Sequence, residues 1–264
     1  MGMEPNRIAL VVAAGVGIAA AAWYFLRSPE PAPAPPPPAA KLAPAPAPEP
    51  AKPEHYPAPT AQAEPAEKPL PALDDSDGAL LAALASVLGR DATGRFLVPE
   101  RLVRNIVVTV DNLPRRSFAM RLSPLKPVGG MLATTGKDAS LAIAPENAAR
   151  YAPWIALLEK VDAKRLVALY ARAYPLFQQA YVELGYPDGH FNTRLVQVID
   201  HLLATPEPAE PLRLTVPHVL AEYADPKLEA ESAGRKVLLR MGNANAAKVK
   251  AKLREIRRAL VDAG

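Results

Sequence analysis

The sequence predicts a mainly α-helical, compact domain with at most a short β-hairpin, preceded by one transmembrane helix and a disordered Pro/Ala-rich linker. Three observations support this prediction: a charge-free apolar run lies near the N-terminus, prolines crowd residues 29–71, and apolar residues recur at helical spacing in much of the remaining chain. These features divide the chain into a cytoplasmic N-terminus (1–7), an anchor (8–26), a spacer (28–73) and a helical soluble domain (74–264).

The anchor reads IALVVAAGVGIAAAAWYFL from Ile8 to Leu26 and contains no charged residue. As a helix it spans about 28 Å, which matches the hydrocarbon core of a bilayer. Its far end carries three adjacent aromatic residues, which favour the headgroup zone, and Arg7 and Arg27 bound the run. We therefore expect residues 8–26 to bind the lipid bilayer as a single-pass span of the inner membrane.

A cleaved signal peptide is the alternative interpretation of the same run. Ala20-Ala21-Ala22 satisfies the small-residue cleavage pattern, and cleavage there would leave Trp23 as the mature N-terminus. An uncleaved helix instead gives the aromatic rings an interface to occupy. The flanking charges favour neither orientation strongly, and the downstream composition favours a cytoplasmic N-terminus with the C-terminal domain in the periplasm.

The spacer, residues 28–73, contains 17 prolines and 13 alanines. Each proline removes a hydrogen-bond donor and disfavours helix in the residue before it, so the segment is predicted to be extended. In the polyproline II conformation its 46 residues reach at most about 140 Å. The segment is either a measured spacer or a generic linker, and a partner that binds polyproline is a third interpretation.

The first half of the domain predicts two helices and an irregular insert. Asp74, Asp75 and Asp77 precede the apolar run 79–84, which Gly89 ends, so the carboxylates are expected to cap a helix. A second helix is expected from Pro99 to a break at residues 112–114. Residues 115–144 contain the one place where strand is expected, as a short hairpin.

The second half predicts three longer helices. One begins at Asp162, with a kink expected at Pro175, and the next ends at Thr205-Pro206 after a glycine-rich turn at residues 185–189. Four aromatic residues of the first of these helices form a stripe that is either core or a candidate interaction surface, and its spacing favours core: Tyr170, Tyr174, Phe177 and Tyr181.

The last helix places Val249, Leu253, Ile256 and Leu260 on one face. Six cationic residues occupy its remaining circumference and form a candidate basic face: Lys248, Lys250, Lys252, Arg254, Arg257 and Arg258. Such a helix can bind an anionic polymer or lipid, although a solvated outer face is the commoner explanation.

Composition and motifs restrict the chemistry. The chain has no cysteine, and none of its four histidines forms an i, i+4 pair, so thiolate zinc sites and zincin-like sites are excluded. No nucleotide-binding or serine-hydrolase motif occurs, and we predict neither a cofactor nor a metal. A net charge of +4 is common in proteins that bind no nucleic acid, so nucleic acid is not the partner we expect. Asp200 and Glu183 are acid–base candidates in name only.

Several residue groups carry a resemblance to a known family. They are Tyr174-Pro175-Leu176-Phe177-Gln178, Ala180-Tyr181, Glu183-Leu184-Gly185-Tyr186-Pro187, Phe191-Asn192, Asp200, Leu202-Leu203-Ala204-Thr205-Pro206 and Leu238-Leu239-Arg240-Met241-Gly242. Over roughly residues 70–264 the chain resembles the proteobacterial family catalogued as domain of unknown function 3014. The resemblance implies an N-terminal anchor, a Pro/Ala-rich stretch and a Gram-negative envelope setting, and it implies no activity.

The sequence therefore leads us to expect a membrane-tethered, extracytoplasmic interaction or scaffold module with an envelope protein or polymer as partner. An envelope enzyme with an unrecognised acid–base site is one alternative. An anionic-polymer binder that uses the basic C-terminal helix is the other.

Overall fold

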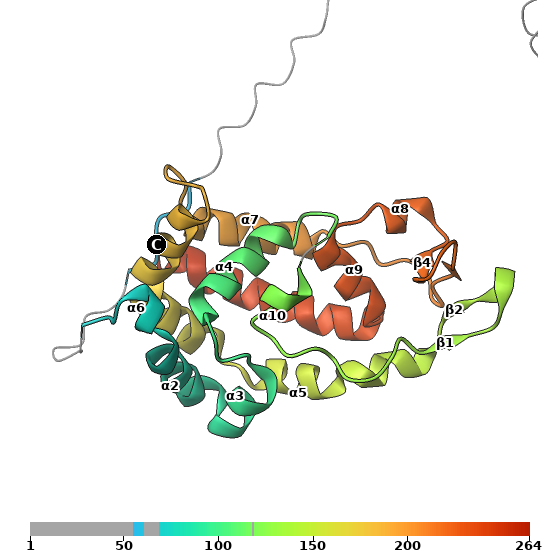
Figure 1. Cartoon of the computed structure of the whole chain (residues 1–264), viewed down its shortest axis with the longest axis horizontal. Coiled ribbons are helices and arrows are strands. Elements are labelled where there is room, and N and C mark those ends of the chain that lie inside the picture. Colours follow the sequence, from blue (N-terminus) through green and yellow to red (C-terminus); the bar gives the residue numbers. More distant parts are fainter. Residues whose placement is uncertain (1–54, 61–68, 118) are drawn as a thin grey trace, which may run out of the picture. The chain divides into compact units, whose positions relative to one another are not determined.

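The computed structural model describes residues 55–60, 69–117 and 119–264, which all belong to the second of the two units into which the chain divides, residues 52–264 (Figure 1). The elements are η1 (Leu73–Asp75), α2 (Asp77–Leu88), α3 (Arg90–Phe96), α4 (Leu102–Asn112), η2 (Met120–Leu122), β1 (Thr134–Thr135), η3 (Asp138–Ser140), β2 (Ala142–Ile143), η4 (Pro145–Tyr151), α5 (Ala152–Lys160), α6 (Ala163–Glu183), α7 (Phe191–Leu203), β3 (Leu214–Thr215), β4 (Glu222–Tyr223), α8 (Pro226–Glu229), α9 (Ala233–Arg240) and α10 (Asn243–Asp262). The prediction of a mainly helical domain is confirmed.

Helix α6 lies at the centre of this arrangement. The Asp162 carboxylate caps it by accepting from the backbone N–H groups of Lys164 at 2.9 Å and Arg165 at 3.0 Å. The helix continues through Pro175 to Glu183 and packs against α2, α4 and α10. Its apolar stripe thus meets helices from both ends of the domain.

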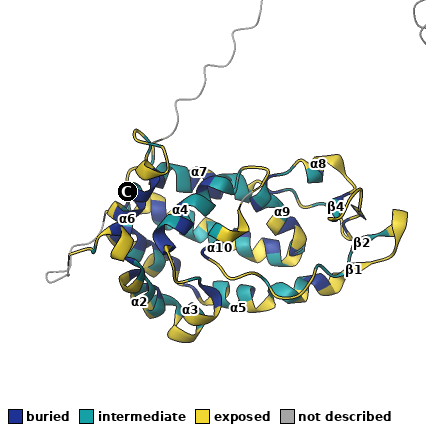
Figure 2. Cartoon of the chain, in the orientation of Figure 1, coloured by how far each residue is buried: buried dark blue, intermediate teal, exposed yellow. Residues whose placement is uncertain are grey.

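The main core is shared by α2, α4, α6, α7 and α10. Its fully buried side chains include Leu102, Val107, Phe191, Val196 and Leu260, and burial follows the inner faces of these helices (Figure 2). Each helix carries one apolar face, so the five faces close on one another. All buried residues of this core lie at position 73 or later.

The strand prediction needs a correction. The expected hairpin is present, because Thr134 pairs with Ile143 and Thr135 with Ala142. A second two-stranded sheet, which the sequence did not predict, is formed by β3 and β4 with Leu214 opposite Tyr223. Backbone bonds join the two hairpins, since Ile143 N–H donates to Leu212 at 2.9 Å and Leu214 N–H donates to Leu141 at 2.8 Å. A small second core forms around this junction.

Part of the predicted spacer packs on the helical domain. Leu73 is buried in the main core, and residues 55–60 lie against α7 and α10 near the C-terminus, where Thr60 N–H donates to Ala263 at 2.8 Å (Figure 1). The predicted anchor, residues 8–26, lies outside the described residues. Among the helices that are described, none combines the length and apolarity that a bilayer crossing requires.

Candidate functional site

The aromatic stripe proposed as an interaction surface lies mostly in the core. Tyr170, Phe177 and Tyr181 are buried, and Tyr174 is half-buried. The Phe177 ring stacks on the ring of Phe191 with centroids 5.7 Å apart, and burial raises the pKa of Tyr170. The three buried rings stabilise the packing of α6 on α7 and are covered, and only Tyr174 remains partly accessible.

The six cationic residues of the basic face do not form one surface. Lys250 is buried and donates to the Thr205 carbonyl at 2.6 Å and to the Glu207 carboxylate at 2.7 Å. Lys248, Lys252 and Arg257 form ion pairs with Glu159, Glu255 and Asp200 respectively. Arg254 and Arg258 remain exposed, so α10 presents two outward cations whose charge no ion pair with a described residue offsets.

The two acid–base candidates do not meet. Asp200 of α7 pairs with Arg257 of α10, whose pKa it raises, whereas Glu183, the last residue of α6, pairs with Arg104 of α4. The hydrogen bond from Gln179 and the one from Arg104 lower the pKa of Glu183. Each carboxylate is therefore paired with its own arginine, and the two carboxylates do not form a pair with each other.

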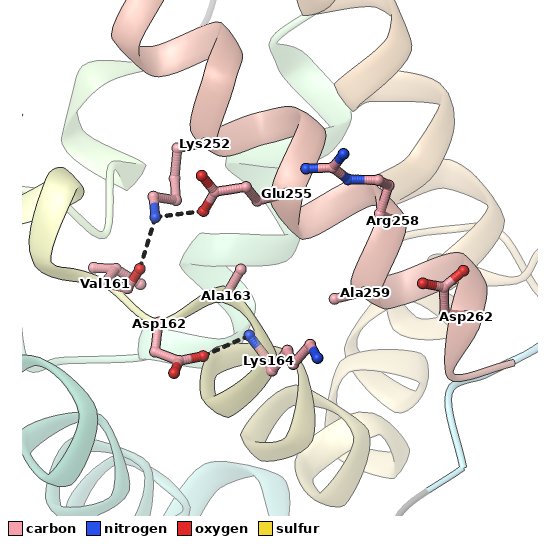
Figure 3. Close-up of a pocket in the computed structure, with 9 residues that line it drawn as sticks. All are labelled: Val161, Asp162, Ala163, Lys164, Lys252, Glu255, Arg258, Ala259 and Asp262. Carbon is pink, nitrogen blue, oxygen red and sulfur yellow. Dashed lines mark hydrogen bonds and ion pairs between the residues drawn. The ribbon is translucent and has the colours of Figure 1, made fainter.

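A polar groove of about 530 Å³ lies between the start of α6 and the end of α10 (Figure 3). Lys252 donates to the Val161 carbonyl at 2.8 Å and to the Glu255 carboxylate at 2.5 Å, while Asp162 is occupied in capping α6. Three cations and three carboxylates line the groove, so their charges balance. These contacts join α10 to the α5–α6 junction and select for no charged ligand.

Residues 55–60 pack against a second surface, formed by Asn192, Thr193 and Arg257, and we call this binding surface the Tyr56 groove. Thr193 bonds both backbone groups of Tyr56, since its hydroxyl accepts from Tyr56 N–H at 3.1 Å and donates to Tyr56 C=O at 3.3 Å. The Asn192 amide donates to the Pro57 carbonyl at 2.5 Å. Two adjacent side chains of α7 thus form hydrogen bonds directly with the backbone of the segment.

The tyrosine side chain is held as well. The Arg257 guanidinium lies 5.9 Å from the centroid of the Tyr56 ring and donates to its hydroxyl at 3.3 Å. Asp200 accepts from the same guanidinium at 2.5 and 3.0 Å, which fixes its orientation. Beyond the tyrosine, Pro59 is buried, and the His55 and His190 rings meet with centroids 4.5 Å apart.

The Tyr56 groove also contains an unsatisfied polar atom. Asn192 is 1% exposed, and its Oδ1 has no hydrogen-bond partner among the described residues. Leaving a buried acceptor unpaired costs about 1 to 3 kcal/mol. Pro57, whose carbonyl the same amide contacts, has no N–H to offer. One signal in the sequence could have indicated this site, because Tyr56 is the only Phe, Tyr or Trp in residues 28–73.

In the described part of the chain, no group of three or more His, Asp or Glu side chains is placed to hold a metal ion.

Comparison with known proteins places the chain in a family. The model of the family described as "Protein of unknown function (DUF3014)" matches residues 102–257, and the chain belongs to this family. The match covers α4 to α9 and most of α10, and so includes Asn192, Thr193 and Arg257 of the Tyr56 groove. No curated protein and no solved structure matches the chain.

Proposed function

We propose that this DUF3014 protein is a membrane-tethered interaction module of the bacterial envelope, whose helical domain binds extended, proline-containing peptide segments. The observation that carries the proposal is the clamp that Asn192 and Thr193 form on the backbone of Tyr56 and Pro57. In this arrangement the chain's own segment is one occupant of the groove. A partner segment of the same chemistry is the other.

The clamp suits proline-rich segments for a physical reason. Proline keeps the backbone extended and leaves its carbonyls without partners, so a groove that donates to those carbonyls gains hydrogen bonds at a low entropic cost. Asn192 supplies donors of this kind, and Thr193 can both donate and accept. Arg257 adds selection for an aromatic side chain at the position of Tyr56.

The unpaired Asn192 Oδ1 favours exchange of the bound segment. A ligand that carries an N–H group within reach of this oxygen would satisfy an acceptor that residues 55–60 leave unpaired. The chain's own segment is therefore an incomplete ligand, which a partner with one further donor would displace.

Binding by residues 69–264 to a labelled peptide with the sequence of residues 52–62 tests the proposal. Because all buried core residues lie at 73 or later, this fragment should fold without the segment and leave the groove empty. We expect saturable binding by fluorescence anisotropy, lost in Asn192→Ala and retained in the control Gln197→Ala, an exposed position of the same helix. The proposal is contradicted if the folded fragment does not bind the peptide, or if the Asn192→Ala variant binds it as tightly as the parent fragment.

The intact chain supplies the competition experiment. It should bind the same peptide more weakly than the fragment, since its own segment occupies the groove, and Tyr56→Ala should recover the affinity. In this cysteine-free chain the pair His55→Cys and His190→Cys should form a disulfide within one molecule under oxidising conditions. A disulfide only between molecules would show that the segment docks on a second copy.

The proposed location is the inner membrane, with residues 8–26 as a single-pass anchor, the N-terminus in the cytoplasm and the domain in the periplasm. The charge-free composition of this run and the aromatic residues at its end support the proposal. Residues between the anchor and Tyr56 would then carry the groove away from the bilayer.

A further inference from the structure

A third groove, separate from the Tyr56 groove, lies where α3, the segment after η2 and the η4–α5 junction meet. Its volume is about 280 Å³, and we call it the Trp154 groove after the aromatic residue on its wall. Phe96 and Trp154 line it together with three cationic residues, Arg95, Lys126 and Arg150, and none of its lining residues is acidic.

Two aromatic rings form one side of the Trp154 groove. The Phe96 and Trp154 centroids lie 4.5 Å apart with their planes at 60°. Phe96 is buried and Trp154 is half-buried, so the tryptophan supplies the accessible aromatic surface. A half-exposed indole beside a groove offers a ligand both a flat apolar face and an N–H donor.

The three cations keep their charge uncompensated by any carboxylate of the described residues. Lys126 Nζ donates to the Gly94 carbonyl at 2.7 Å, and Arg150 donates to Gly129 at 3.0 Å, Gly130 at 2.7 Å and Asn147 Oδ1 at 2.8 Å. All four acceptors are neutral. Arg95 makes a ring contact with Phe96 at 5.2 Å.

Donors remain for a ligand after these contacts are counted. A lysine ammonium has three N–H groups and a guanidinium has five, so Lys126 keeps two and Arg150 keeps two. The segment that carries Lys126 adds no carboxylate, because residues 113–137 contain five Lys/Arg, of which Arg115 pairs with Asp111, and no Asp or Glu. The groove thus combines an aromatic face with spare cationic donors.

We propose that the Trp154 groove binds an acidic saccharide, in which a sugar ring packs on Trp154 and a carboxylate or phosphate group meets Lys126 and Arg95. Sugar rings present C–H groups to an aromatic face, and the anionic group would form charge-assisted hydrogen bonds with the free donors. The volume admits a short unit rather than a long polymer segment. The preference for saccharide over nucleic acid rests on the proposed envelope location.

Tryptophan fluorescence tests this proposal with little ambiguity. The chain has two tryptophans, Trp23 and Trp154, so in the Trp23→Phe full-length protein in detergent the emission reports the groove alone. Titration with trigalacturonic acid should give a saturable change that added salt weakens. Neutral maltotriose and tripolyphosphate, which lack the charge and the ring respectively, should each bind at least about tenfold more weakly.

Variants assign the effect to the groove. Lys126→Gln and Arg95→Gln should each lower the affinity for trigalacturonic acid about tenfold, whereas Arg90→Gln, an exposed position of the same helix outside the groove, should leave it unchanged. The proposal is overturned if trigalacturonic acid gives no saturable change, if maltotriose or tripolyphosphate binds equally well, or if Lys126→Gln binds like the parent.

Oligothymidylate is the remaining comparison, because nucleotides also combine a ring with a phosphate. Binding weaker than that of trigalacturonic acid supports the saccharide, and tighter binding replaces it with single-stranded nucleic acid. The peptide assay on the Tyr56 groove does not depend on any of these residues, so failure of the two proposals can be told apart.

Discussion

The carboxylate of Asp77 accepts a hydrogen bond from the backbone N–H of Leu102 at 2.7 Å, although 25 residues separate the two. Its other oxygen accepts from the N–H of Arg101 at 2.6 Å. An acidic residue in the first turn of α2 therefore caps α4, whose start at Arg101 has φ 53° and supplies no cap of its own. An acidic residue of this group caps a helix as expected, but the capped helix is α4 and not α2.

Asp77→Ala should destabilise the domain by about 1 to 2 kcal/mol, because α4 would lose the acceptor for its first N–H groups. Urea unfolding followed by circular dichroism measures the change. Asp75→Ala is the matched control, since Asp75 is exposed and its side chain caps no helix in the described part of the chain, so a change within about 0.5 kcal/mol is expected. Equal losses in both variants would contradict the capping account.

Asp111→Asn should cost more, about 1.5 to 3 kcal/mol, because it removes the charge of a buried carboxylate that accepts hydrogen bonds from two partly exposed arginines. The Asp111 side chain is 2% exposed and bonds Arg115 at 2.5 Å and Arg194 at 2.9 Å. Removing its charge would leave two arginines without their counterion where α4 meets α7. Thermal or urea unfolding checks this prediction.

The surface pair of Lys248 with Glu159 is the control for Asp111, since both side chains are about half exposed, 51% and 52%. Glu159→Gln should change the free energy of unfolding by no more than about 1 kcal/mol. A similar cost for the two variants would show that burial does not strengthen the Asp111 cluster.

The stability of the domain should fall as the pH drops below about 6.5, and His201 should contribute to this loss. Burial, followed by the nearby charge of Arg235, lowers the pKa of His201 below its ordinary value of 6.5. The unfolded state then binds more protons between the folded pKa and 6.5, so acidification through that window favours unfolding. His201→Gln should flatten the dependence measured from pH 7.5 to 5.

His218→Gln provides the comparison for His201. His218 is exposed in the loop between β3 and β4, whereas His201 bonds Ser232 Oγ at 2.8 Å. The His218 variant should keep the parental pH dependence of unfolding. If both variants flatten the curve alike, the local environment of His201 is not its cause.

Alkaline phosphatase fused after Gly264 should be active, because the proposed topology places the domain in the periplasm. An inactive phosphatase together with an active cytoplasmic reporter at the same site would reverse the orientation. N-terminal sequencing of the mature protein checks the anchor, since a chain that begins at Trp23 would show cleavage.

The long helices could be predicted because their apolar spacing persists over several turns. Tyr170, Phe177 and Tyr181 of α6 are buried as the stripe requires, and Gly89 ends α2 with φ 90° as its position suggested. By contrast, α3 spans only 7 residues and α9 only 8, too few for a repeat to stand out. The β3 and β4 strands have two residues each, and backbone bonds to the β2 region hold them.

The candidate sites were harder to predict, because each depends on residues that are distant in sequence. The Tyr56 groove joins residues 137 and 201 positions apart, and the spacer composition around Tyr56 indicated only an extended chain. The burial of Lys250 within the predicted basic face could not be predicted for the same reason, since its acceptors, Thr205 and Glu207, lie on another segment. Helical spacing says which side chains share a face but not what lies opposite that face.

The separation of Tyr56 from Arg257 has a consequence for how the protein is made. Tyr56 is added to the growing chain 201 residues before Arg257, which at about 5 to 20 residues per second is an interval of roughly 10 to 40 s. During synthesis the segment has no assembled groove to enter, and any protein that recognises it could bind first. Docking of the segment on its own domain therefore begins only after this interval, and slower translation lengthens it.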